Sequence, residues 1–428
     1  MVRLTLFDIQ IVSKYLCTSL DLINLVKICK KYNELIKSLY FNPIRVTKFN
    51  YELFENIETQ HVFTKFDYII DGIKHVYHYN VNYSDIDKHD FIDEYKSVNC
   101  KYSDLQNLDL NRFKVAKLDI DQEIENIDLQ KFGFTNLYGR MFYNTNLKDV
   151  VIPEGVISLG NAAFRDCNKL TNVILPNSIV KIGVNCFQDC SGLTTITLPQ
   201  ELTELCDGAF KYCTNLEHVN VNNKLTIIGE VVFLHCDKLK TIDLGNTCIT
   251  KLHHTFSESR KLTSVILPKG LKTIGSYSFY NCTNLTALEL PNSLTNLCNN
   301  AFSRSGLINI IVPKNVEFID VYCFKDCNHL KNVQICGSKI IAGYAFMGCV
   351  SLTSVVLPDN LTIIDKCCFA NCSKLSQIKL PLSLNKICDD AFKCCYSLTY
   401  LNLEGVNNIS DSAFDGCMNL EKYWNWFF

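Results

Sequence analysis

The sequence predicts a mainly β solenoid of about 12–13 coils of 22–23 residues, preceded by a small α-helical module. Two regularities indicate the solenoid. Thirteen phenylalanines recur at intervals of 22 or 23 residues from Phe142 to Phe414, and ten of them have a cysteine three residues later. Eight of the nine prolines fall in one register of the same repeat. A fixed period in the twenties is typical of coils that bury their apolar faces by stacking on one another.

Residues 1–46 form the first predicted unit. Apolar residues fall at helical spacing between Leu6 and Tyr40, which predicts three short helices. The run YLCTSLDLINLVKICKKYNELI resembles an F-box, the small helical module that docks on the Skp1 adaptor of ubiquitin ligases. The likeness is clearest at Asp21-Leu22 and at residues 26–32, although the usual Leu-Pro start is absent and Tyr32 stands where Trp is common.

Two roles follow for this N-terminal module. The resemblance implies docking of a Skp1-like adaptor, while the alternative is a helical cap that shields the first coil of the solenoid. We expect five apolar residues to supply either surface: Leu6, Ile11, Leu16, Leu22 and Leu25.

Residues 47–125 form an intermediate region without proline. The segment FDYIIDGIKHVYHYNVNY predicts a hairpin, because Asp71-Gly72 is a favoured two-residue turn between alternating strands. The later runs VAKLDI and IENIDL look like degenerate repeat strands that lead into the solenoid at residues 126–428.

One coil of the solenoid, LTSVILPKGLKTIGSYSFYNC, predicts the geometry of the others. Alternation places Val265 inward and Ser264 and Ile266 outward on a short strand. Pro268 ends that strand, because proline has no N–H for the ladder. A second apolar pair then leads through a bend to Phe279, whose ring points into the core.

This repeat resembles the leucine-rich repeats of the BspA-like type over about two thirds of the chain. The resemblance implies a right-handed solenoid that binds other proteins, and several members are described as surface or adhesive proteins of bacteria and anaerobic protists. Departures from the pattern include the coils in which Ser259 and Ser305 stand in the place of the cysteine.

The 23 cysteines admit two interpretations. Spacings of four, as at Cys186 and Cys190, make a metal or redox site conceivable. The interpretation that we favour is packing, because ten cysteines share one repeat position and no CxxC pair occurs. We therefore predict no metal site and no cofactor.

Several classes of function are disfavoured. The sequence contains no HExxH, no GxSxG and no phosphate-binding glycine loop, so we expect neither an enzyme nor catalytic residues. A formal charge of −2 provides no field that would gather nucleic acid. No apolar run approaches the roughly 20 residues that span a bilayer, and the first residues do not resemble a secretion signal. These features favour a cytoplasmic location, with unconventional export to the cell surface as the alternative.

The predicted function is non-catalytic recognition of a protein partner of unknown identity, as the substrate-selecting arm of an F-box-type ligase or, alternatively, as a BspA-like surface adhesin. We expect the partner to contact the outward residues of the strands before the prolines, and the alternative surface is the loop edge at residues 222–224 and Asn246. The strand-face candidates in the middle of the array are Thr195, Thr197, His218, Asn220, Thr241, Asp243, Ser264 and Ile266.

Overall fold

The computed structural model describes residues 59–62, 74–82, 94–100, 114–115, 118–120, 126–129, 136–137 and 139–420. The chain divides into two compact units, the first made mostly of residues before 125 and the second of residues after 143. The predicted N-terminal helices, with Leu6, Ile11, Leu16, Leu22 and Leu25, lie outside the described residues.

The first unit contains a parallel sheet. Its strands are β1 (Thr59–Val62), β2 (Lys74–Asn82), β3 (Glu94–Cys100), β4 (Lys114–Val115) and β5 (Leu118–Ile120). Strand β2 pairs in parallel with β1 on one side and with β3 on the other, and Tyr77 is in register with both neighbours. The predicted hairpin at Asp71-Gly72 is therefore wrong, because the edge that an antiparallel partner would need is already occupied.

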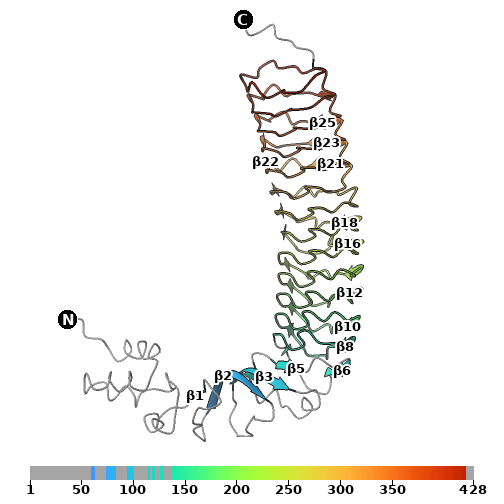
Figure 1. The fold of residues 1–428 in the computed structure, drawn as a ribbon, viewed down its shortest axis with the longest axis vertical. Coiled ribbons are helices and arrows are strands. Elements are labelled where there is room, and N and C mark those ends of the chain that lie inside the picture. Colours follow the sequence, from blue (N-terminus) through green and yellow to red (C-terminus); the bar gives the residue numbers. More distant parts are fainter. Residues whose placement is uncertain are drawn as a thin grey trace, which may run out of the picture. The chain divides into compact units, whose positions relative to one another are not determined.

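The second unit is a solenoid built from two stacks of short parallel strands (Figure 1). The strands that precede the proline position form the first stack: β6 (Asn126–Asp128), β8 (Asp149–Val151), β10 (Asn172–Ile174), β12 (Thr195–Thr197), β14 (His218–Asn220), β16 (Thr241–Asp243), β18 (Ser264–Ile266), β21 (Asn309–Val312), β23 (Asn332–Ile335), β25 (Ser354–Val356) and β27 (Gln377–Ile378).

The second stack follows the proline position and consists of two-residue strands. They are β7 (Asn136–Leu137), β9 (Ser158–Leu159), β11 (Lys181–Ile182), β13 (Glu204–Leu205), β15 (Ile227–Ile228), β17 (Lys251–Leu252), β19 (Thr273–Ile274), β20 (Asn296–Leu297), β22 (Phe318–Ile319), β24 (Ile340–Ile341), β26 (Ile363–Ile364), β28 (Lys386–Ile387) and β29 (Asn408–Ile409). The mainly β solenoid predicted from the repeat is thereby confirmed.

The coil that contains Phe279 has the predicted geometry. Val265 is buried in the middle of β18, whereas Ser264 and Ile266 on either side of it are exposed. After the strand, the amide of Leu271 donates to the carbonyl of Pro268 at 3.1 Å, which turns the chain toward β19. The glycine at the next bend is needed for coil contact, because a Cβ on Gly275 would lie 2.6 Å from the carbonyl oxygen of the preceding coil's Leu252.

The phenylalanine rings form a continuous column in the core. Consecutive rings from Phe164 to Phe414 stack with centroids 5.1–5.8 Å apart. The coil spacing matches the separation at which aromatic rings attract one another in offset stacks. This column joins the coils through side chains, in addition to the backbone ladders of the two strand stacks.

The turn around each phenylalanine repeats an unusual backbone. Residues two before and two after the ring adopt left-handed angles in nearly every coil, as Val231 (φ 51°) and His235 (φ 56°) do around Phe233. Alternate amides then bond in different directions. The amide of Phe233 donates to Thr255 of the next coil at 2.9 Å, and the amide of Leu234 donates back to Val231 at 3.2 Å. The turn is therefore held both within and between coils.

Both strand stacks are interrupted, but at different heights. The first stack divides between β10 and β12 and between β18 and β21, while the second divides between β15 and β17. The atypical His253-His254 pair directly follows β17, on the C-terminal side of the break in the second stack.

Candidate partner-binding surface

The sheet β12–β14–β16–β18 presents all eight predicted strand-face residues to solvent. Each strand has a buried middle residue between two exposed ones, so its outward side chains form two columns along the solenoid. The two columns consist of Thr195, His218, Thr241 and Ser264, and of Thr197, Asn220, Asp243 and Ile266. We call these eight residues the strand face.

Parallel pairing fixes the register of the strand face. Thr195 is opposite His218, His218 is opposite Thr241, and Thr241 is opposite Ser264. Neighbouring strands lie about 4.8 Å apart, so successive side chains stand one strand spacing from each other. A partner that crosses the sheet would meet one new pair of side chains per coil.

The polar groups of the strand face are only partly used within the chain. The Asn220 amide donates to the Thr197 hydroxyl at 3.1 Å, and one Asp243 carboxylate oxygen accepts from the Gly245 amide at 2.8 Å. The imidazole of His218 makes no hydrogen bond with the described part of the chain, and Ile266 is 54% exposed. The strand face therefore retains both hydrogen-bonding capacity and apolar area for a partner.

Two exposed ion pairs lie beside the strand face. Lys240 donates to Glu217 at 2.6 Å, and Lys224 donates to Glu201 at 2.6 Å. The bond from Lys240 holds the pKa of Glu217 below its usual value. Because these charges are exposed and paired, they contribute little long-range field to this surface.

The alternative loop edge is partly a structural element. Asn222 occupies the position that proline holds in other coils, and it is buried. Its amide donates to the carbonyls of Pro199 and Leu202, while its side-chain oxygen accepts from the Lys224 amide. Asn222 thus fixes the turn, whereas Asn223, Lys224 and Asn246 are the exposed groups of this edge.

The repeated cysteines form a hydrogen-bonded ladder as well as a packed one. The Cys213 thiol donates to the carbonyl of Phe187, one coil back, at 3.1 Å, and most other cysteines of this position do the same. Ser259 makes the equivalent bond to Phe233 at 2.9 Å. The packing interpretation is confirmed, and the bond explains why serine replaces cysteine without disturbing the stack.

The described cysteines do not form a reactive or metal-binding group. All of them are free thiols, and burial raises the pKa of most, Cys213 among them. A raised pKa keeps the thiol protonated, whereas nucleophilic and metal-bound cysteines are thiolates. The described residues hold no cluster of three or more His, Cys, Asp or Glu placed to bind a metal.

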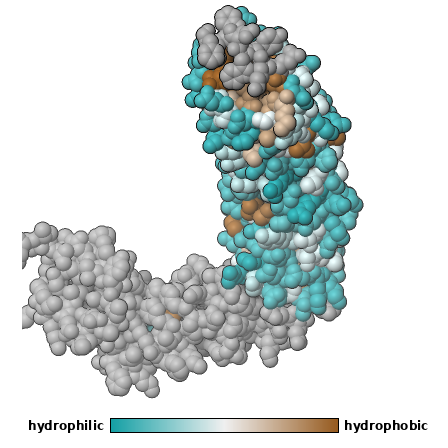
Figure 2. Space-filling view, turned by 45° about the horizontal axis from the view of Figure 1, so that its top comes forward, coloured by the Kyte–Doolittle hydropathy of each residue, from teal (hydrophilic) through white to brown (hydrophobic). Residues whose placement is uncertain are grey.

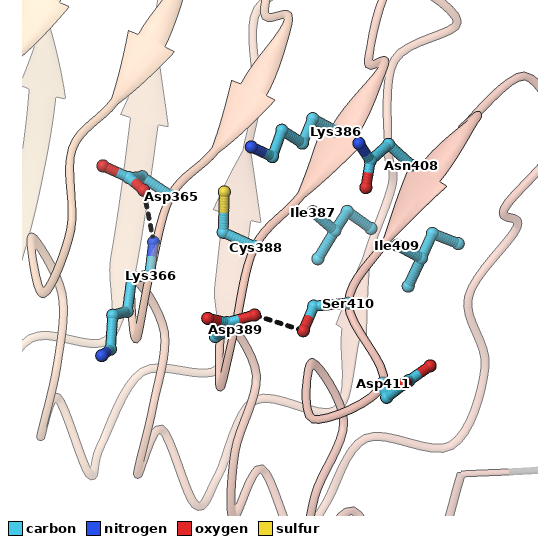
Figure 3. Close-up of a pocket in the computed structure, with 10 residues that line it drawn as sticks. All are labelled: Asp365, Lys366, Lys386, Ile387, Cys388, Asp389, Asn408, Ile409, Ser410 and Asp411. Atoms are coloured by element: carbon cyan, nitrogen blue, oxygen red, sulfur yellow. Dashed lines mark hydrogen bonds between the residues drawn. The ribbon is translucent and has the colours of Figure 1, made fainter.

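A shallow cavity of about 550 Å³ lies over β26, β28 and β29 (Figure 3). Two of its three acidic groups accept local hydrogen bonds: Ser410 donates to Asp389, and the Lys366 amide donates to Asp365 at 2.7 Å. Burial raises the pKa of the Cys388 thiol, which therefore is no activated nucleophile. This cavity offers no arrangement of acid, base and nucleophile.

The turn side carries aromatic pairs that the sequence analysis did not single out. His254 stacks on Tyr277 at 4.8 Å, and Tyr322 stacks on Tyr344 at 4.9 Å. All four residues adopt the left-handed conformation two positions before the phenylalanine. The sequence has His or Tyr two positions before several of the repeated phenylalanines, and this recurrence could have indicated the aromatic pairs. All four side chains are half-buried.

Comparison with known proteins identifies the repeat. A family model for the BspA type leucine rich repeat region matches residues 135–262, 250–340 and 339–424, in six copies. The chain belongs to the BspA-type leucine-rich repeat family. Proteins of this family are typically non-enzymatic binding scaffolds, which agrees with the absence of a catalytic arrangement on the surfaces described above.

A solved structure of a leucine-rich repeat protein shares the fold of this chain. A leucine-rich repeat protein from Bacteroides ovatus is 30% identical, with 67% of this chain and 81% of that chain covered and a TM-score of 0.57. A leucine-rich cell surface protein from Faecalibacterium prausnitzii is 22% identical, with 80% and 86% covered and a TM-score of 0.44. No curated protein matches this chain.

The family match does not extend to the predicted F-box-like module. Its first residue is 135, so residues 1–46 are untouched by it. In the described part of the chain, no helix has both the length and the hydropathy needed to cross a membrane.

Proposed function

We propose that this BspA-type protein is a non-catalytic scaffold that binds a protein partner through the strand face. The observation that supports the proposal is the in-register array of eight exposed side chains on a sheet whose middle residues are buried. Rigid sheets hold such side chains at fixed spacing, so little entropy is lost when a partner binds. The free imidazole of His218 and the exposed Ile266 supply polar and apolar contacts side by side.

The test compares two variants that each carry three substitutions. In the face variant, His218, Asn220 and Asp243 are changed to alanine. The matched control changes Thr250, Lys251 and Asn296, which are exposed on the second strand stack and its adjoining turn. Neither set contributes to the core, so both variants should keep the melting temperature of the wild type.

The readout is quantitative affinity capture followed by measured binding of the captured protein. We expect a partner that is retained by the wild type and the control but bound several-fold more weakly by the face variant. A partner that binds the face variant normally and loses affinity when Lys224 and Asn246 are changed would place recognition on the loop edge. That result would overturn the proposal.

The second part of the proposal concerns the compartment in which the protein acts. We infer a reducing compartment such as the cytoplasm, because 20 described cysteines are free and many donate to carbonyls as protonated thiols. The alternative is the adhesin role at the cell surface, which the family resemblance suggests. Labelling of intact cells with a membrane-impermeable reagent separates the two, since strong labelling of the full-length chain would exclude the cytoplasmic role.

The ligase role requires the N-terminal module. If residues 1–46 dock a Skp1-like adaptor, the full chain should co-purify that adaptor and a chain without residues 1–46 should not. The circular dichroism of the solenoid should stay nearly unchanged in the shorter chain. Absence of an adaptor from the full chain would leave the scaffold role standing and remove the ligase role.

A further inference from the structure

The C-terminal end of the solenoid exposes its core. In the last described coil, Val406, Ile409 and Phe414 are half-exposed, although they occupy inward positions of the repeat. In the preceding coil the equivalent residues are at most 1% exposed: Leu384, Ile387 and Phe392. A stacked coil therefore covers these positions everywhere except at this end.

Other apolar side chains add to this surface. In the last coil Met418 is 83% exposed and Tyr400 is 54% exposed, and in the preceding coil Leu382 is 81% exposed. Figure 2 shows hydrophobic residues gathered at this end of the solenoid, whereas the rest of the visible face is mostly hydrophilic. Exposed apolar area of this kind marks an interaction site. Repeat arrays generally need a cap with a polar outer side at such an end.

The residues that directly follow have the composition of an apolar cover. Residues 421–428 read EKYWNWFF, in which five of eight side chains are aromatic. Each aromatic side chain can bury about 150–250 Å². In extended form eight residues reach roughly 26 Å, which exceeds the separation of about 10 Å between packed sheets. The segment is therefore long enough to cross the open coil.

We propose that residues 421–428 pack across the open end and cover Val406, Ile409 and Phe414. The charged pair Glu421-Lys422 is adjacent to the last coil, and the aromatic residues come after it. This order lets the charges stay in water while the rings cover the core. The proposal concerns the C-terminal end of the solenoid and does not depend on the strand face.

Tryptophan fluorescence tests the cap directly. The chain contains two tryptophans, and both belong to this segment, at positions 424 and 426. In the full-length wild type we expect blue-shifted emission that iodide quenches weakly. Emission typical of tryptophan in water, with strong quenching, would overturn the proposal.

Two double variants locate the contact. Val406→Gln with Ile409→Gln changes the open end, and the matched control Ile157→Gln with Ile174→Gln changes exposed residues near the other end of the solenoid. We expect the first pair to shift the emission to the red and to increase quenching, and the control to leave both unchanged. Equal emission from the two variants would overturn the proposal.

Removal of residues 421–428 provides a second readout. We expect a lower melting temperature and concentration-dependent self-association in light scattering, because the open end is then uncovered. An unchanged melting temperature and mass would contradict the proposal. A full-length chain that is already a dimer, with emission that shifts to the red on dilution, would mean that a second copy covers the end instead.

Discussion

Replacement of Phe279 by alanine tests the central column of the solenoid. The ring is 0% exposed and stacks on Phe256 and on Phe302 with centroids 5.4 Å away on each side. Two stacked pairs are worth about 1–3 kcal/mol beyond area burial. Loss of the ring also leaves a cavity between coils, so the free energy of unfolding should fall by about 3–5 kcal/mol in total.

Chemical denaturation followed by circular dichroism measures this loss. The control is Lys269→Ala, which removes an exposed side chain on the turn after Pro268 and should be nearly silent. Because each coil contacts only its neighbours, hydrogen exchange should show the largest loss of protection in the coils on either side of Phe279. Equal losses of stability in the two variants, or a loss of protection spread evenly over the solenoid, would refute the column as the source of stability.

Three further predictions concern the turn and the thiol ladder. Cys236→Ser should be more stable to urea than Cys236→Ala by about 1 kcal/mol, because serine keeps a donor to the Phe210 carbonyl; equal midpoints would contradict this. Val231→Asn should raise the free energy of unfolding by about 1 kcal/mol, since Val231 has φ 51° and a β-branched residue pays most for that conformation; a lower urea midpoint would count against it. Burial raises the pKa of Cys213 and other core thiols above the ordinary value of 9.0. As the pH rises above about 9, these thiols lose their protons in the unfolded chain but keep them in the folded one. The free energy of unfolding should therefore fall, by up to about 1.4 kcal/mol per pH unit and thiol. Denaturation midpoints that stay constant between neutral and strongly alkaline pH would show that these thiols are not buried.

The repeat could be predicted because its physical causes are local and recur. Alternation in LTSVILP identifies the strand, the missing N–H of Pro268 identifies its end, and the constant spacing of Phe279 and its equivalents identifies the core. The strand face follows from the same alternation, so the exposure of His218 and Ile266 was also predictable. Partner binding at that face stays a prediction.

Other features depend on contacts that a single coil does not reveal. The sequence allowed a hairpin at Asp71-Gly72, but pairing of β2 with β1 and β3 decides the topology. The bond from Cys213 to the Phe187 carbonyl joins residues 26 positions apart. Likewise, the left-handed angles at Val231 and Tyr277 are imposed by amides that bond to the next coil, against the preference of these side chains.

The interruptions of the two strand stacks occur between different pairs of coils, so no two of them lie at the same level of the solenoid. Pairing of β11 with β13 bridges the gap between β10 and β12, and pairing of β14 with β16 bridges the gap between β15 and β17. The run from β19 through β20 to β22 bridges the gap between β18 and β21. A force that pulls along the solenoid axis is therefore resisted between all of these coils by backbone hydrogen bonds of at least one strand stack, and also by the stacked phenylalanine rings. Within the described coils, separation of the solenoid at any level would therefore have to break backbone hydrogen bonds.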